Sequence, residues 1–284
     1  PRRDPVSAPA PAGQFSLNTP RADRLERLWQ ACQSHANQPV PPHWLALVLD
    51  GGRCGWVEPD TARRLAQAPS PFALDGGRLV LEPRQGDDPQ ACSKALQGAA
   101  QRLHEAGVVR EWRSEQLDVR SEDGRAIGTV ERAACRALGI ETRSVQLNAC
   151  RPDGSVVAAR RAAHKLSDPN RWDNLAGGMI AAGEQDDQAL AREAWEEAGL
   201  RLAQLPLVRG SRLRVQRMVA EGLMIETVQV FDVHLPADFV PANQDGEVAG
   251  FQTMPVESAV DAIERGDFTL QASMAILDAL RRQR

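Results

Sequence analysis

The chain has 284 residues, a formal net charge of −4, and 42% hydrophobic and 25% charged residues. This composition is that of a globular protein with one large or two ordinary domains, and the weak negative charge argues against a nucleic-acid or anionic-membrane surface. No apolar run approaches the roughly 20 residues that span a bilayer, and the five cysteines are scattered without C-x-x-C spacing. We therefore expect a cytoplasmic protein with reduced thiols.

The first half of the chain predicts a leader and a small mixed domain. Residues 1–20 are rich in proline, alanine and serine, a composition that buries too little apolar surface to become ordered. We predict a disordered leader there and an N-terminal α+β domain over residues 21–143. Helical spacing predicts helices near residues 25–32, 90–105 and 128–138, and strands are expected on either side of the turn at residues 50–52. This half carries no recognisable catalytic constellation.

The second half, residues 144–284, predicts a larger α/β domain. Strands at 145–149 and 155–160 flank a hairpin turn, and a longer hairpin is expected from 212–219 and 225–234. An acidic helix that ends at Gly199 lies between the two hairpins, and two helices close the chain. Strands with one helix in their midst and helices at the end predict a mixed sheet between helices.

Three glutamates of the acidic helix lie on one of its faces. Glu193, Glu196 and Glu197 are three and four residues apart, so their carboxylates project from the same side. Like charges at these spacings destabilise a helix by about 0.2–0.5 kcal/mol per pair, and a divalent cation would remove that cost. Mg²⁺ and Mn²⁺ prefer oxygen ligands and share their coordination shell with substrate phosphates. The face therefore indicates metal-dependent phosphate chemistry, with a merely solvated acidic face as the alternative.

The segment from Gly178 to Leu200 also resembles the signature of a known family. It fits Gly-x5-Glu-x7-Arg-Glu-U-x-Glu-Glu-x-Gly-U, where U is apolar, and this pattern is similar to that of the Nudix hydrolases. The resemblance implies a Nudix-type α/β/α sandwich. It also implies Mg²⁺ or Mn²⁺ as the cofactor, and it identifies as metal ligands Glu193, Glu196, Glu197 and the carbonyl of Gly178.

The same resemblance implies a reaction, which is hydrolysis of a diphosphate linkage in a small organic molecule by water attack at phosphorus. Arg192 is expected to orient the neighbouring carboxylates, with Glu184 as its partner. Glu193 is the first candidate for the general base. Glu247, in the polar loop 243–247, is the second candidate; the alternative for it is a solvated loop acid.

Four residues upstream of the acidic helix are candidates for binding the substrate. Lys165 and one of the two neighbouring arginines, Arg160 and Arg161, are expected to reach its phosphates. The alternation of a strand sends the two arginines to opposite faces, so at most one lies in the cleft. Trp172 is either a core aromatic or a stacking wall for a heterocycle.

Further strings resemble one subgroup of the family. Residues 159–165 and 172–178 resemble Nudix proteins that follow a domain related to a thiamine-pyrophosphokinase fusion partner, and residues 50–59 and 105–113 are similar to that domain. The resemblance implies thiamine diphosphate or its oxidised analogues as the substrate. We expect the N-terminal domain to shape the substrate pocket or to form a homodimer contact.

Two other functions are alternatives to hydrolysis. A non-catalytic Nudix-like sensor binds a ligand without hydrolysing it, and such sensors usually lose glutamates that are complete here. Isopentenyl-diphosphate isomerases share the fold but need Cys and His in a Trp-x-Asn-x-x-Cys-Gly-His segment. Here Gly177 and Met179 occupy those positions, so we favour a hydrolase.

Overall fold

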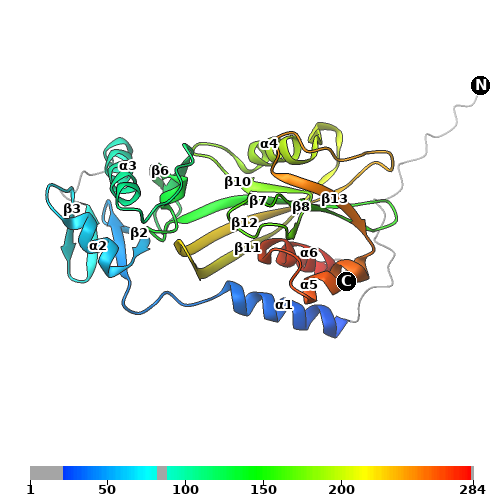
Figure 1. Ribbon diagram of the computed structural model, residues 1–284, viewed down its shortest axis with the longest axis horizontal. Coiled ribbons are helices and arrows are strands. Elements are labelled where there is room, and N and C mark those ends of the chain that lie inside the picture. The colour runs from blue at the N-terminus through cyan, green and yellow to red at the C-terminus, as the bar shows by residue number, and fades with distance from the viewer. Residues whose placement is uncertain (1–21, 82–87, 283–284) are drawn as a thin grey trace, which may run out of the picture.

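The computed structural model describes residues 22–81 and 88–282. The leader predicted over residues 1–20 lies outside the described residues. Two sheets lie one after the other along the long axis of the molecule, and each has helices of its own (Figure 1). Among the described residues, no helix combines the length and the apolarity that crossing a membrane requires.

The smaller unit is built on a four-stranded sheet in the order β2-β1-β4-β3, with a separate β5–β6 hairpin. Helix α3 packs against β6, and the interior is an apolar cluster that includes Leu47, Leu79 and Leu96. Its elements are β1 (Leu45–Leu49), β2 (Gly52–Val57), α2 (Pro59–Ala66), β3 (Phe72–Asp75), β4 (Arg78–Leu81), α3 (Pro89–Glu105), β5 (Gln116–Arg120) and β6 (Ala126–Glu131).

The helix predicted over residues 128–138 is wrong. The chain forms β6 up to Glu131 and then a short 3-10 turn, η1 (Arg132–Ala134). Gly128 has no side chain, and a Cβ there would press on Cys92 and Ser93 of α3 at 3.2 Å. Close packing on α3 and pairing with β5 therefore outweigh the helical spacing of the apolar residues.

The larger unit contains a seven-stranded mixed sheet in the order β11-β12-β7-β8-β13, with β10 paired to β7 and β9 to β8. β7 and β12 are parallel, and the remaining pairs are antiparallel. The elements are β7 (Glu141–Cys150), β8 (Val156–Arg161), β9 (Trp172–Asp173), β10 (Ala176–Met179), α4 (Asp186–Ala198), η2 (Leu202–Gln204), β11 (Leu207–Val219), β12 (Gly222–His234), β13 (Val248–Met254), α5 (Val256–Glu264) and α6 (Leu270–Arg282).

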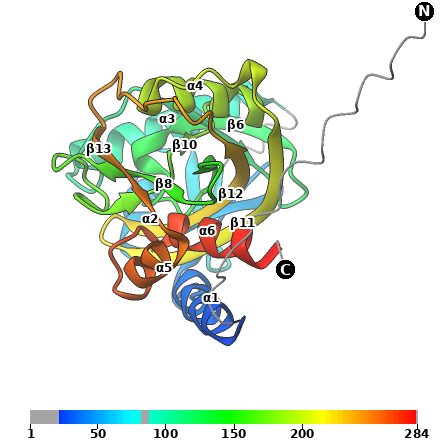
Figure 2. The same ribbon diagram turned by 90° about the vertical axis from the view of Figure 1, so that its right-hand side faces the viewer.

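Helices cover both faces of this sheet, which confirms the predicted α/β/α sandwich. α4 covers one face, where Leu190 and Ala194 pack on Val145 and Leu147. α5 and α6 cover the other face, together with α1 (Ala22–Ala36) (Figure 2). Helix α1 precedes the smaller unit in sequence but packs against α6, so we propose that it belongs structurally to the larger unit.

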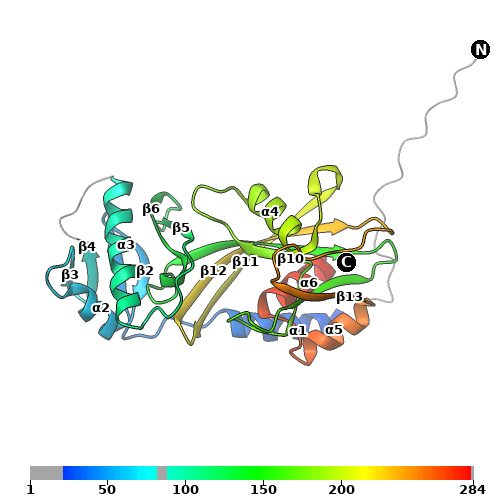
Figure 3. The same ribbon diagram turned by 45° about the horizontal axis from the view of Figure 1, so that its top comes forward.

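Strand β7 divides one of its edges between two partners, and this division positions the cleft. Residues 144–147 of β7 pair with β10, whereas residues 149–150 pair with β8. The sheet consequently opens between β10 and β8. Figure 3 shows α4 above β10, with the smaller unit at one end of the long strands β7, β11 and β12.

Candidate functional site

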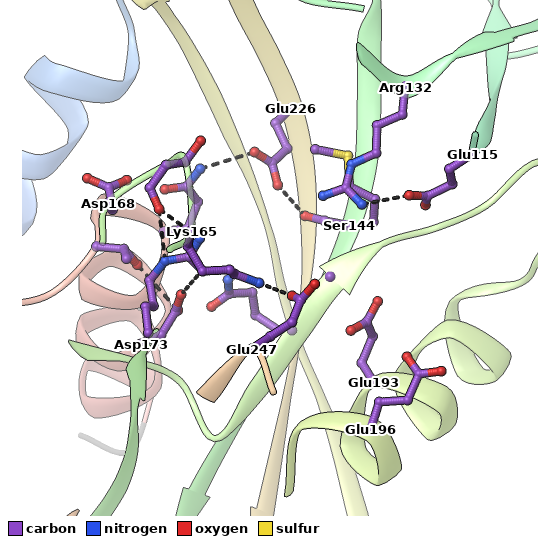
Figure 4. Close-up of a pocket in the computed structure, with 18 of the residues that line it drawn as sticks. Glu115, Arg132, Ser144, Lys165, Asp168, Asp173, Glu193, Glu196, Glu226 and Glu247 are labelled. Atoms are coloured by element: carbon purple, nitrogen blue, oxygen red, sulfur yellow. Dashed lines mark hydrogen bonds and ion pairs between the residues drawn. The ribbon is translucent and has the colours of Figure 1, made fainter. Parts of the chain in front are cut away.

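A cleft of about 470 Å³ lies where the sheet opens, and both units contribute to its walls (Figure 4). Charged side chains dominate its lining. The carboxylates are those of Glu115, Asp168, Asp173, Glu193, Glu196, Glu226, Asp245 and Glu247, and the cations are Arg132, Arg136, Arg161, Lys165 and Arg192. A second cavity of about 440 Å³ shares Arg132, Arg136, Ser167, Met179 and Met224 with it.

Helix α4 presents its acidic face to the cleft because its opposite face is apolar. Ala189, Leu190 and Ala194 are fully buried against the sheet, which fixes the rotation of the helix about its axis. The helix ends at Gly199, as predicted, and the positive φ of 65° at this residue suits glycine.

Two glycines of β10 let the backbone approach the carboxylates of α4. The N–H of Gly177 donates to Oε2 of Glu197 at 2.9 Å. A Cβ on Gly178 would collide with the carboxylate of Glu193, so glycine lets this carboxylate keep its position. The structure therefore places Gly178 directly against one of the three predicted metal ligands.

Arg192 ties the carboxylates of this region together. Its Nε and Nη2 donate to the two carboxylate oxygens of Glu184 at 3.1 and 3.0 Å. Its Nη1 donates to Glu193 at 2.7 Å and to Glu196 at 3.3 Å, and Nη2 also donates to the carbonyl of Met179. Glu184 lies behind Arg192, outside the cleft lining. Burial disfavours its ionisation, but the bonds from Arg192 and from the N–H of Ala181 outweigh burial and hold its pKa below the ordinary value.

Burial destabilises the charged forms of Glu193 and Glu197. Burial and, after it, the negative charge of Glu193 together raise the pKa of Glu197 to about 8. Burial likewise raises the pKa of Glu193. The nearest cation to Glu197 is the ammonium of Lys165, 4.0 Å from its Oε1, which also forms an ion pair with Glu247. Two buried carboxylates that repel each other are a setting that a cation would relieve.

The donor set suits a hard divalent cation, because it consists of carboxylate oxygens beside a glycine carbonyl. Among the described residues, no three acidic, histidine or cysteine side chains converge as a metal cluster. Arg192 holds Glu193 and Glu196 instead, and Lys165 lies beside Glu197. A cationic side chain of the protein thus lies beside each of the three glutamates.

The predicted substrate-binding residues divide into two pairs. Lys165 and Arg161 line the cleft, and Arg161 also donates to Asp173 at 2.9 Å. Arg160 and Trp172 do not line it: the Arg160 guanidinium lies 5.2 Å from the centre of the Trp172 ring, and this ring packs partly against the apolar cluster beneath α5 and α6. Strand alternation sends the two arginines to opposite faces.

Sequence reasoning missed two arginines from the connection between the units. Arg132 donates to Glu115 at 2.6 Å, and Arg136 donates to Ser167 at 3.3 Å and pairs with Glu221 at 3.1 Å. Both line the cleft, and the positive charge of Arg132 favours ionisation of Glu193. No local motif marks them, because only the folding of the connection across the end of β7 brings them to the site.

Two family models match separate segments of the chain. Residues 141–273 match the NUDIX domain family. Residues 25–142 match a family described as a domain of unknown function, DUF4743.

The chain is similar to Nudix hydrolase 24, chloroplastic, of Arabidopsis thaliana, with 27% identity over 74% of this chain and 59% of that protein. An uncharacterised Nudix hydrolase of Streptomyces coelicolor, SCO1686, is 41% identical over 30% of this chain and 47% of its own length. The crystal structure of DR0079 from Deinococcus radiodurans is 20% identical, with a TM-score of 0.47, over 59% of this chain and 98% of that one. The chain thus spans less than two thirds of these two curated relatives. It carries a NUDIX domain at residues 141–273 and is a homologue of Nudix hydrolases.

Proposed function

We propose that this protein hydrolyses a diphosphate linkage in a small organic diphosphate, with a divalent cation and by water attack at phosphorus. The observation that carries the proposal is that Glu193 and Glu196 line a charged cleft, where Gly178 leaves room for Glu193 and the N–H of Gly177 donates to the adjacent buried Glu197. The homology with Nudix hydrolases supports the same reaction class.

Glu193, Glu196, Glu197 and the Gly178 carbonyl are the proposed holders of Mg²⁺ or Mn²⁺. When bound, the cation supplies neutralisation of phosphate oxygens and favours ionisation of the attacking water. Arg192 positions Glu193 and Glu196 through its hydrogen bonds, and Glu184 holds Arg192 by accepting two of them.

Glu193 remains our first candidate for the general base, because its carboxylate lies in the cleft beside the backbone of Gly178. Glu247 is the second candidate. Its side chain is half exposed, and its ion pair with Lys165 places it near Glu197. Turnover by Glu247→Gln distinguishes the two, because Glu193 is also a proposed metal ligand and its replacement should lower turnover in either case. Near-normal turnover of Glu247→Gln would favour Glu193 as the base, and a large loss would favour Glu247.

The substrate's phosphates are proposed to contact Lys165, Arg132 and Arg136. The carboxylates that pair with the two arginines, Glu115 and Glu221, are 29% and 45% exposed, and exchanging such an exposed partner for a phosphate costs little. Residues matched to the domain of unknown function would in this way contribute to phosphate binding.

Thiamine diphosphate or an oxidised analogue is the substrate that the sequence resemblance favours. A cytoplasmic location and a homodimer stay predictions from the sequence. Isomerisation is disfavoured, because no cysteine lines the acidic cleft and burial raises the pKa of the Cys150 thiol to about 12.

A screen with Mg²⁺ and Mn²⁺ for release of inorganic phosphate, pyrophosphate or phosphate monoesters tests the proposal. The panel comprises thiamine diphosphate, its oxidised analogues, ADP-ribose, dinucleotides and nucleoside triphosphates. We expect release from at least one diphosphate and none in EDTA. No release from any compound, together with a ligand-induced rise in melting temperature for one of them, would support the sensor instead.

A further inference from the structure

A buried carboxylate lines the cleft away from the acidic helix. Glu226 on β12 is 5% exposed. One of its oxygens accepts a hydrogen bond from the Ser144 hydroxyl at 2.5 Å, and the other accepts one from the Gln271 amide at 3.1 Å. Glu226 and Ser144 lie apart from Glu193 and Glu196 (Figure 4).

No cationic side chain of the described residues forms an ion pair with Glu226. The glutamates of α4, in contrast, pair with Arg192 or Lys165. A buried charge without a counter-ion is costly, and hydroxyl and amide donors compensate only part of that cost. Each carboxylate oxygen can accept two hydrogen bonds, so Glu226 retains capacity for a further donor on each oxygen.

A second side chain of the same cleft has an acceptor atom to which no group donates. Gln146 lines the cleft with only 9% of its surface exposed, and its Oε1 has no hydrogen-bond partner. The arginines and Lys165 are engaged with other acids, as described above. Gln146 lies against Gly177 of β10, whereas Glu226 lies on β12 beside Ser144. The cleft therefore has an acceptor without a donor at Gln146 and remaining acceptor capacity at Glu226.

We propose that Glu226 selects the part of the substrate that carries no phosphate, and that this part is a nitrogen heterocycle presenting N–H donors or positive charge. The proposal rests on the proposed function, since it concerns the phosphate-free part of the same substrate in the same cleft. It explains why a carboxylate with remaining acceptor capacity lines the cleft where the described residues supply no ion-pair partner.

Binding measurements on Glu226→Gln test the proposal. The variant keeps the shape of the side chain but replaces one acceptor with a donor. The matched control is Glu141→Gln, which changes an exposed carboxylate on β7 that accepts from Thr227 of β12, outside the cleft. Dissociation constants are measured calorimetrically in EDTA, where we expect no hydrolysis, for thiamine diphosphate, ADP and CDP, which carry nitrogen heterocycles; phosphate release is measured separately with Mg²⁺. Isopentenyl diphosphate and inorganic pyrophosphate serve as probes without N–H donors.

We expect wild type and Glu141→Gln to bind at least one heterocyclic diphosphate more tightly than isopentenyl diphosphate. Glu226→Gln should raise the dissociation constant of that heterocyclic probe by about tenfold to a hundredfold, the effect of one hydrogen bond to a charged group. Its affinity for pyrophosphate should stay within about twofold, and its melting temperature should stay near that of the wild type.

Equal weakening of all probes would overturn the proposal, because it would indicate a structural role for Glu226. Unchanged affinities would overturn it too, as would a wild type that prefers isopentenyl diphosphate. The proposed function fails separately, when the wild type binds these probes but releases no phosphate from any of them.

Discussion

The two units of the molecule differ in what they bury. Among the described residues, the smaller unit has two buried polar or charged side chains, Thr61 and Glu131, whereas residues 141–282 have twelve. Buried polar groups lower stability unless they are paired. Ser144, Gln146, Glu226 and Thr269, which are among the twelve, line the cleft, so part of the difference between the units comes from the candidate site. The smaller unit is an apolar scaffold that contributes to the cleft from its boundary, through Arg132 and Arg136.

The largest effect is expected for Glu197→Gln. Removing one negative charge from the proposed ligand set should lower kcat/KM by more than about 100-fold, beyond the usual effect of a residue that only supports a ligand. Mg²⁺ should raise the melting temperature of the wild type, since a ligand of the folded state stabilises it, but not that of the variant. Asp187→Asn, an exposed change on the same helix, is the control. Near-normal activity of Glu197→Gln would refute the ligand assignment.

Gly178→Ala should be the next most harmful change. The new methyl group would collide with the carboxylate of Glu193 and displace it, and a displacement of about 1 Å in a site can cost about 100-fold in rate. Steady-state kinetics measures the loss. An alanine variant with unchanged kcat would show that the position of Glu193 against β10 is unimportant.

Arg132→Gln tests whether the smaller unit contributes to phosphate binding. Losing one charge-assisted hydrogen bond should lower kcat/KM by about tenfold to a hundredfold and weaken inhibition by inorganic pyrophosphate. Arg63→Gln, an exposed change on α2, should do neither. Equal behaviour of the two variants would confine the site to the larger unit.

The smallest effect is expected for Gly98→Ala in the smaller unit. Gly98 lies in the middle of α3, and a Cβ there meets nothing within 4 Å. Alanine should therefore raise the free energy of unfolding by about 0.5–1 kcal/mol, because glycine is a poor helix former, and should leave kcat unchanged. Chemical denaturation provides the measurement, and a destabilised variant would contradict the packing described for α3.

The order of the elements predicted a mixed sheet between helices, and the resemblance to the Nudix signature implied the sandwich and the role of Arg192 beside its neighbouring carboxylates. The i, i+3 and i, i+4 positions of α4 determine which glutamates share a face, and Gly199 ends the helix. Arg132, Arg136 and Glu226 could not be predicted in the same way, since their place depends on the pairing of β12 with β7 and on the course of the connection after β6.

The origin of the oxygen atom in the product tests the central claim most directly. With Mg²⁺, in water enriched in oxygen-18, the best substrate of the phosphate-release screen should give a phosphate product that carries one labelled oxygen. Mass spectrometry should detect no such product in EDTA or with Glu197→Gln. Labelled product formed equally well without a divalent cation, or phosphate released without label, would contradict metal-dependent attack of water at phosphorus on the acidic face of α4.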